Sequence, residues 1–139
     1  MNEQIPQTPL PVSANEERQW AMISHLSVLV NLFTVFMGAV IPLVIYFLYK
    51  DRSKFVAFHA MQSFVMQVIC FLGGGIITVV TATIGGTIIP LIGSICGCLF
   101  ALLPLAGLIY GVYGGMQVNQ GKDFKYPVIG DLVQNSIMK

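Results

Sequence analysis

The stretch from Phe55 to Gly121 contains no Asp, Glu, Lys or Arg and is rich in Ile, Leu, Val, Phe, Gly and Thr. Soluble domains carry about 25% charged residues, so an uncharged stretch of this length does not suit the shell of a water-soluble globule. A helix that crosses a hydrocarbon core needs roughly 20 apolar residues. The stretch therefore indicates a membrane protein with two crossing helices in this region.

The overall composition agrees with this interpretation. Of the 139 residues, 9% are charged and 55% are hydrophobic, and the formal net charge is +1. Nucleic-acid binding needs Lys and Arg gathered on one face, but the basic residues here are scattered over three polar segments. We predict one small integral membrane domain whose surroundings are the lipid bilayer, without nucleic-acid partners. The sequence contains no cofactor fingerprint.

The N-terminal residues 1–15 are polar and contain three prolines. Such a segment buries too little apolar surface to order itself, and it lacks the apolar core and cleavage site of a signal peptide. We expect a flexible cytoplasmic tail there. Ser13 and Glu16 have the spacing of a capping box, which predicts that a helix begins near Ala14.

The uncharged residues from Gln19 to Tyr49 allow two interpretations. One is a single long helix from about Arg18 to Lys50, which would give a protein with three spans. The other is a hairpin whose first helix stops near Met37 and Gly38. In the hairpin, Pro42 falls in the first turn of a short second helix, where proline is tolerated. In the single helix, Pro42 would break the hydrogen-bonding pattern.

Basic residues favour the hairpin, because cytoplasmic loops carry the excess of Lys and Arg. With four helices, every basic residue lies on one side of the membrane. They are Arg18, Lys50, Arg52, Lys54, Lys122, Lys125 and Lys139. We therefore predict an all-α integral membrane bundle of four helices with both termini in the cytoplasm, and three spans remain the alternative.

The glycine and proline pattern divides the remaining sequence. One outside turn is predicted near Gly85 to Pro90, with the third helix over 55–83 and the fourth over 88–118. The membrane helical domain then covers residues 16–126, and an amphipathic segment covers 127–139. In that segment, apolar residues recur on one helical face within a stretch too short to span, which predicts an interfacial helix. They are Val128, Ile129, Leu132, Val133 and Ile137.

Two rows of small residues lie in the fourth predicted helix. Gly107, Gly111 and Gly115 stand four apart, and Gly93 and Gly97 repeat the spacing earlier. Rows of this kind let two helix backbones approach closely in lipid. We favour packing within one molecule, and a dimer interface is the alternative.

Two stripes of polar side chains occur in the first and third predicted helices. The first holds Ser24, Ser27, Asn31 and Thr34 beside His25, and the second holds His59, Gln62, Ser63 and Gln67. Polar side chains in a bilayer face the interior of a bundle or a wet cavity, so we expect the stripes to face each other. Interhelical hydrogen bonding is the favoured role, and a polar path is the alternative.

Enzymatic chemistry finds little support in these residues. A metal site needs three or four ligands, and only Cys70 could join His25 and His59. Neither Ser24 nor Ser27 sits in a nucleophile motif with an oriented base. The three cysteines lie in apolar stretches and are expected to act as small hydrophobic residues. We therefore predict a non-enzymatic protein without a metal site.

Four motifs in order resemble those of small bacterial membrane proteins grouped with the magnetosome proteins MamF and MmsF. They are RQWAMISHLS from Arg18, VIPLVIYFLYKD from Val40, SKFVAFHAMQS from Ser53 and VNQGKDFKYP from Val118. That group is distantly similar to the twenty-kilodalton-class subunit of the chloroplast inner-envelope protein translocon. The resemblance implies a multi-pass protein of the bacterial inner (plasma) membrane and supplies no catalytic residues.

Two functional hypotheses follow from these observations. The first is a protein that acts through helix-mediated assembly, as a homo-oligomer or as a small subunit with other membrane proteins. The glycine rows and polar stripes motivate it. The second is a component of a transport or protein-translocation pathway, motivated by the polar stripes and by the resemblance to the translocon subunit.

Overall fold

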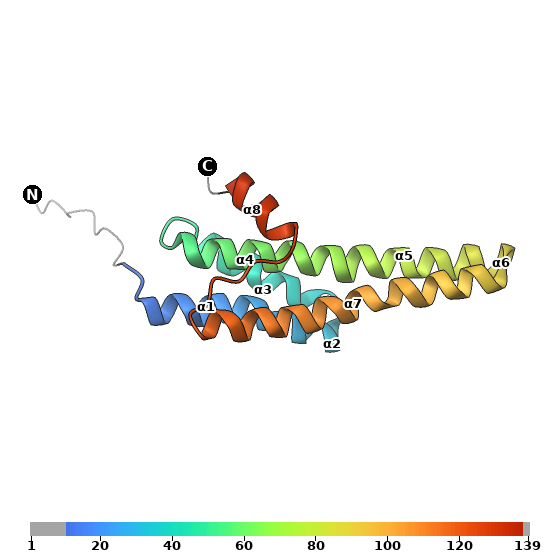
Figure 1. The fold of residues 1–139 in the computed structure, drawn as a ribbon, viewed down its shortest axis with the longest axis horizontal. Helices are drawn as coiled ribbons and strands as arrows, with labels where there is room; N and C mark the ends of the chain where they lie inside the picture. The colour runs from blue at the N-terminus through green and yellow to red at the C-terminus, as the bar shows by residue number, and fades with distance from the viewer. Residues whose placement is uncertain (1–10, 138–139) are drawn as a thin grey trace, which may run out of the picture.

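The computed structural model describes residues 11–137 (Figure 1), and every regular element in that range is helical. This confirms the predicted all-α class. The predicted tail over residues 1–15 lies mostly outside the described residues, and Lys139 lies wholly outside them. A long helical hairpin and a short one lie side by side, and a small C-terminal helix lies against the long one.

The long hairpin has two arms that run beside each other (Figure 1). The first arm contains α4 (Lys54–Gln67), α5 (Gly74–Val80) and α6 (Gly86–Ile88), joined by π-helical turns. The second arm is α7 (Pro90–Asn119). The arms hold 35 and 30 residues, which corresponds to roughly 50 and 45 Å at 1.5 Å per residue. Both are long and apolar enough to cross a membrane.

The long hairpin turns at Ile89, within the turn predicted at Gly85 to Pro90, but the predicted helix ends on either side of it were wrong. The first arm continues to Ile88 rather than ending at residue 83, and α7 begins at Pro90 rather than at residue 88. Glycines did not break the helix, because they serve packing. A Cβ added to Gly85 would lie 2.8 Å from the Gly93 Cα, so the arms come closest where both lack side chains.

The short hairpin has α1 (Ala14–Leu26) and α2 (Asn31–Thr34) in its first arm and α3 (Val40–Tyr49) in its second. The single long helix from Arg18 to Lys50 is therefore not formed. At the open end of the short hairpin, the Tyr49 hydroxyl donates a hydrogen bond to the Glu16 carboxylate at 2.9 Å and so joins the two arms. Helix α1 begins where predicted, because the Ser13 hydroxyl accepts from the Glu16 N–H at 3.2 Å.

The reversal of the short hairpin depends on Asn31 and Gly38. The Gly38 N–H donates to the Asn31 Oδ1 at 2.8 Å, and a Cβ on Gly38 would lie 2.6 Å from that oxygen. Val35 takes a positive φ of 64° at the same reversal. The first helix therefore ends at Thr34 rather than near Met37 and Gly38, while Pro42 lies in the first turn of α3 as predicted.

The two hairpins differ in length, and this divides the molecule into two halves (Figure 1). The short hairpin lies against α4 and the end of α7 that leads to Asn119. Residues 74–103 of the long hairpin extend beyond it, and we call them the distal half. At the opposite, charged end lie the loop from Lys50 to Lys54 and the segment after Asn119.

Helix α8 (Ile129–Ile137) lies over α4 at the charged end (Figure 1). Its apolar residues divide between two environments. Val133 is 2% exposed, whereas Val128 and Leu132 are 77% and 60% exposed. One part of the predicted apolar face therefore packs on the protein, and the other part is free to contact a membrane surface.

All five glycines predicted to pack helices face other parts of the same chain. In the half of the molecule next to the charged end, which we call the charged half, Gly107 faces Cys70, Gly111 faces Val28 and Gly115 faces Leu26. In the distal half, Gly93 faces Gly85 and Gly97 faces Ala82. The close approaches lie within one molecule, which is the arrangement that the sequence favoured over a dimer interface.

Replacing Gly93 by alanine is expected to lower the thermal stability of the purified protein. Its Cβ would overlap the backbone of Gly85 and Gly86, and overpacking of this kind costs about 1–3 kcal/mol. Gly75→Ala is the matched control, because a Cβ there meets no atom within 4 Å. Alanine favours a helix over glycine, so the control should hold or raise the melting temperature. Equal effects of the two changes would contradict the close packing.

Candidate functional site

The two predicted polar stripes meet in a buried column between α1–α2 and α4. The Ser63 hydroxyl donates to the Ser24 carbonyl at 2.6 Å, and the Gln67 Nε2 donates to the Ser27 Oγ at 2.9 Å. Asn31 extends the column, since its Nδ2 donates to the Gln67 Oε1 at 2.8 Å. All these side chains are at most 4% exposed. We call this set, with His25, His59 and Gln62, the polar column.

Two histidines form the end of the column that faces the charged end. The His25 Nε2 lies 3.2 Å from the His59 Nδ1. The two rings meet edge to face, with centroids 5.4 Å apart. On its other side, the His25 Nδ1 lies 2.9 Å from the hydroxyl of Tyr126. The column therefore joins α1, α4 and the C-terminal segment.

Gln62 connects the histidines to the backbone of the C-terminal segment. Its Nε2 donates to the Phe124 carbonyl at 2.9 Å, and its Oε1 accepts from the Tyr126 N–H at 3.3 Å. These two backbone partners fix which end of the amide is nitrogen. The second proton of the Gln62 Nε2 points to the His59 Nδ1 at 2.9 Å, so this ring nitrogen is an acceptor.

The hydrogen bonds assign the tautomers of both rings in their neutral form. Because the His59 Nδ1 accepts, its proton lies on Nε2. The proton in the 3.2 Å contact then lies on the His25 Nε2, which shares the single lone pair of the His59 Nδ1 with the Gln62 amide, and the His25 Nδ1 accepts from Tyr126. Burial raises the pKa of the Tyr126 hydroxyl above its ordinary value, so the phenol keeps the proton that it donates. The donor of each hydrogen bond is thereby assigned: Tyr126 donates to His25, and both His25 and Gln62 donate to His59.

The His59 Nε2–H is left without a hydrogen-bond partner among the described residues. The nearest charged atom is the Asp123 Oδ1 at 4.0 Å, and the His59 side chain is 0% exposed. A buried donor without a partner costs about 1–3 kcal/mol. The polar column therefore ends at a buried N–H that faces the Asp123 carboxylate.

The segment between α7 and α8 covers the histidine end of the column. Phe124 packs its ring edge to face on His25 at 5.8 Å between centroids. A Cβ on Gly114 would lie 2.6 Å from the Phe124 Cε1, so this glycine makes room for the ring. Tyr126 is 2% exposed. The C-terminal segment is thus an integral part of the site.

Sequence reasoning missed Tyr126 and Phe124 as parts of this site. The available signal was the presence of two aromatic residues in an otherwise polar segment. Aromatic rings bury a large apolar area, so their presence in a polar loop indicates that the loop packs on the protein.

Thr34 of the first stripe is exposed and donates to the Val30 carbonyl at 2.8 Å, so it lies outside the column. The other candidate residues of the two stripes come together in the structure. They are Ser24, His25, Ser27, Asn31, His59, Gln62, Ser63 and Gln67.

The column has little reactive chemistry. The Ser24 and Ser27 hydroxyls donate to the carbonyls of Trp20 and Ser24, at 2.9 and 2.7 Å, so no base draws on either proton. Cys70 is separate from the histidines and contacts the Met66 sulfur at 3.7 Å. Within residues 11–137, no three His, Cys, Asp or Glu side chains gather as a metal site would need.

Tyr126→Phe is expected to loosen the C-terminal segment. The change removes the donor to the His25 Nδ1 and leaves a buried acceptor without a partner, which costs about 1–3 kcal/mol. Melting temperature should fall, and trypsin should cut faster after Lys122 and Lys125 in the detergent-solubilised protein. Tyr113→Phe is the control, because Tyr113 is 51% exposed. An unchanged digestion rate for Tyr126→Phe would contradict the role of its hydroxyl.

Comparison with known proteins agrees with a membrane location. The chain is 31% identical over 90 residues to the UPF0132 membrane protein MJ1527 of Methanocaldococcus jannaschii. The match covers 65% of this chain and 56% of that protein, so the chain spans little more than half of its relative's length. No solved structure matches the chain.

The family comparison covers nearly all of the described residues. Residues 16–133 match the magnetosome magnetite crystal formation protein family. This range contains both hairpins, the polar column and most of α8. It also contains all four motifs that carried the resemblance in the sequence. The chain belongs to the MamF/MmsF family of membrane proteins.

Proposed function

We propose that this protein is a non-enzymatic subunit of the bacterial plasma membrane that acts through helix association. Its distal half would pack against the helices of another membrane protein or of a second copy. The carrying observation is the apolar surface of residues 74–103, which extends beyond the short hairpin (Figure 1). Only 17% of the most apolar window of each arm is buried within the molecule.

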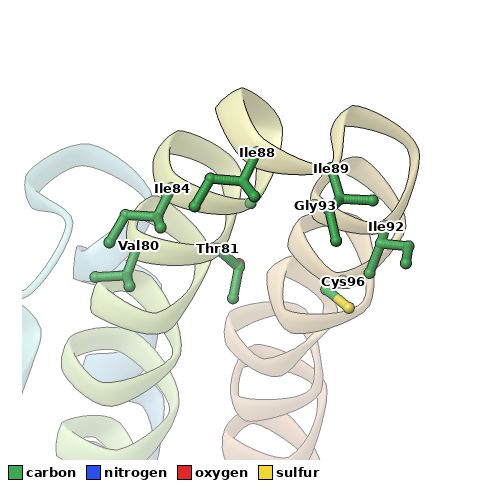
Figure 2. A pocket seen from close by; sticks show the side chains of 9 residues that line it. Val80, Thr81, Ile84, Ile88, Ile89, Ile92, Gly93 and Cys96 are labelled. Atoms are coloured by element: carbon green, nitrogen blue, oxygen red, sulfur yellow. The ribbon is translucent and has the colours of Figure 1, made fainter.

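The distal surface is hollowed rather than smooth. One apolar hollow of about 360 Å³ lies near the turn (Figure 2), where side chains from both arms surround it. A second, of about 420 Å³, lies on α7 between Ser94 and Leu102. A third, of about 400 Å³, lies along α5 and includes Leu103. Hollows of this kind can receive the side chains of an approaching helix.

The hollow on α7 has the residues that favour helix contacts in lipid. Ser94 and Cys98 stand four apart and line it together with Ile95 and Leu99. Small residues at this spacing let two backbones approach, because lipid offers no hydrophobic driving force between helices. The neighbouring Gly93 and Gly97 are already used within the long hairpin. Ser94 and Cys98 leave a second small surface free for a partner.

The arrangement in the membrane follows from charge and hydropathy. In the proposed orientation, the charged end faces the cytoplasm, in line with the preference of Lys and Arg for cytoplasmic loops. The distal half then lies in the bilayer with its uncharged turn at the outer side. Both termini would be cytoplasmic, because α1 begins and α8 lies at the charged end.

Photo-crosslinking in native membranes tests the association directly. A photoreactive amino acid placed at Cys98 should give a discrete protein adduct, with self or with another membrane protein. The same amino acid at Ile109, which is 59% exposed outside the distal half, is the control. Ser94→Leu should fill the hollow and remove the adduct, whereas Thr83→Leu on the other arm should not. Lipid adducts alone at position 98 would refute the proposal.

A component of a transport or translocation pathway is the second candidate. The polar column favours it, because a line of hydrogen-bonding side chains runs from His25 to Asn31 through an apolar bundle. Every member of that line is nearly inaccessible in the present arrangement. A path for a polar cargo would require α1 and α4 to separate along it.

Thiol labelling distinguishes the two candidates. Single cysteines are placed at Ser27, Asn31, Ser63 and Gln67 in a protein without native cysteines, and a membrane-impermeant reagent is added. Helix association as the sole activity predicts no labelling before denaturation at any of the four positions. Labelling at two or more positions in intact membranes would favour the pathway component. A cysteine at Lys122 in the exposed loop serves as the positive control.

A further inference from the structure

A small pocket lies at the charged end between α4, the segment after α7, and α8. Its volume is about 180 Å³. Phe55 and Phe58 supply one side, Asp123 and Lys125 supply opposite charges, and Gln134 comes from α8. It is separate from the polar column but adjoins it through His59. We call it the interfacial pocket.

The interfacial pocket has one negative and one positive side chain in its lining, Asp123 and Lys125. Asp123 contributes one carboxylate, with its side chain 73% exposed. The Lys125 ammonium hydrogen-bonds the Gln134 side chain and lies 6.0 Å from the centre of the Phe58 ring. An ammonium has three protons to donate, so Lys125 can still bind an oxygen. One acid and one base side by side complement a ligand that carries both charges.

The His59 Nε2–H is buried next to two residues that line this pocket, Asp123 and Phe55. It is 4.0 Å from the Asp123 Oδ1, and Phe55 packs on the His59 ring with centroids 4.5 Å apart. The pocket offers the Lys125 ammonium for an oxyanion and the Asp123 carboxylate for a cation.

We propose that the interfacial pocket binds the headgroup of a zwitterionic phospholipid with a primary amine, of the phosphatidylethanolamine type. Its ammonium binds the Asp123 carboxylate beside the aromatic rings, which attract cations. Its phosphate oxygens accept from the Lys125 ammonium. A primary ammonium donates hydrogen bonds to a carboxylate, as charge-assisted pairs do. The trimethylated ammonium of a choline headgroup has no proton for such bonds.

The position of the pocket favours a lipid as the source of this headgroup. The pocket lies where α4 begins its apolar arm and where α7 has just ended. Beside it, α8 exposes Val128 and Leu132, which is typical of a helix lying on a membrane surface. Lipid headgroups are concentrated at this level of the bilayer.

Lipid retention by the full-length protein tests the proposal. The protein is reconstituted into vesicles of equal parts phosphatidylethanolamine, phosphatidylcholine and phosphatidylglycerol, extracted mildly and analysed by native mass spectrometry. Phosphatidylethanolamine should be retained above the other two. Asp123→Asn and Lys125→Gln should each lower its retention roughly tenfold, the effect of losing one hydrogen bond to a charged group. Both side chains are exposed, so folding should persist.

Matched variants and a soluble competitor complete the experiment. Asp131→Asn and Lys122→Gln change exposed charges of the same segment outside the pocket and should leave retention unchanged. Displacement by glycerophosphoethanolamine supports the headgroup chemistry and identifies a soluble zwitterion as a sufficient ligand. Failure of displacement, with retention still sensitive to Asp123→Asn, supports the intact lipid. Equal retention of all three lipids, or equal loss in the matched variants, overturns the proposal.

Discussion

The contact between His25 and His59 is the point on which the rest of the charged half depends. It joins α1 to α4, and through Tyr126 and Gln62 it also holds the segment that leads to α8. Polar groups in an apolar bundle cost free energy unless they find partners inside it. Apart from the His59 Nε2–H, the donors of this network have acceptors within it. Their hydrogen bonds connect three segments that are distant in the sequence.

The distal half is held together by a different interaction. There, hydrogen-bonding side chains give way to glycines, and the two arms approach at Gly85 and Gly93. This packing is specific without being polar, because only residues without side chains fit. The molecule therefore combines a polar, closed half with an apolar half whose outer surface stays free.

Local signals predicted much of this fold. Ser13 predicted the start of α1, and Pro42 with Gly38 predicted the short hairpin, because each of these residues affects the backbone next to it in the sequence. The meeting of the two stripes was predictable from helical spacing and the apolar surroundings. The partnership of Tyr126 with His25 was not, since it joins residues 101 positions apart and no periodicity reports such a contact. The first arm was predicted to end too early, because a glycine that packs, such as Gly85, and one that breaks a helix look alike in sequence.

The unequal hairpins give the molecule a wedge shape. Four helical arms and α8 surround the charged half, whereas two arms make up the distal half (Figure 1). In a bilayer, such a molecule takes up more area in the leaflet at its charged end than in the opposite leaflet. Many copies in one area of membrane pack best where the membrane is curved and the leaflet at their charged ends is on the convex side. With the charged end in the cytoplasm, as proposed, that shape matches a membrane that curves toward the cell interior.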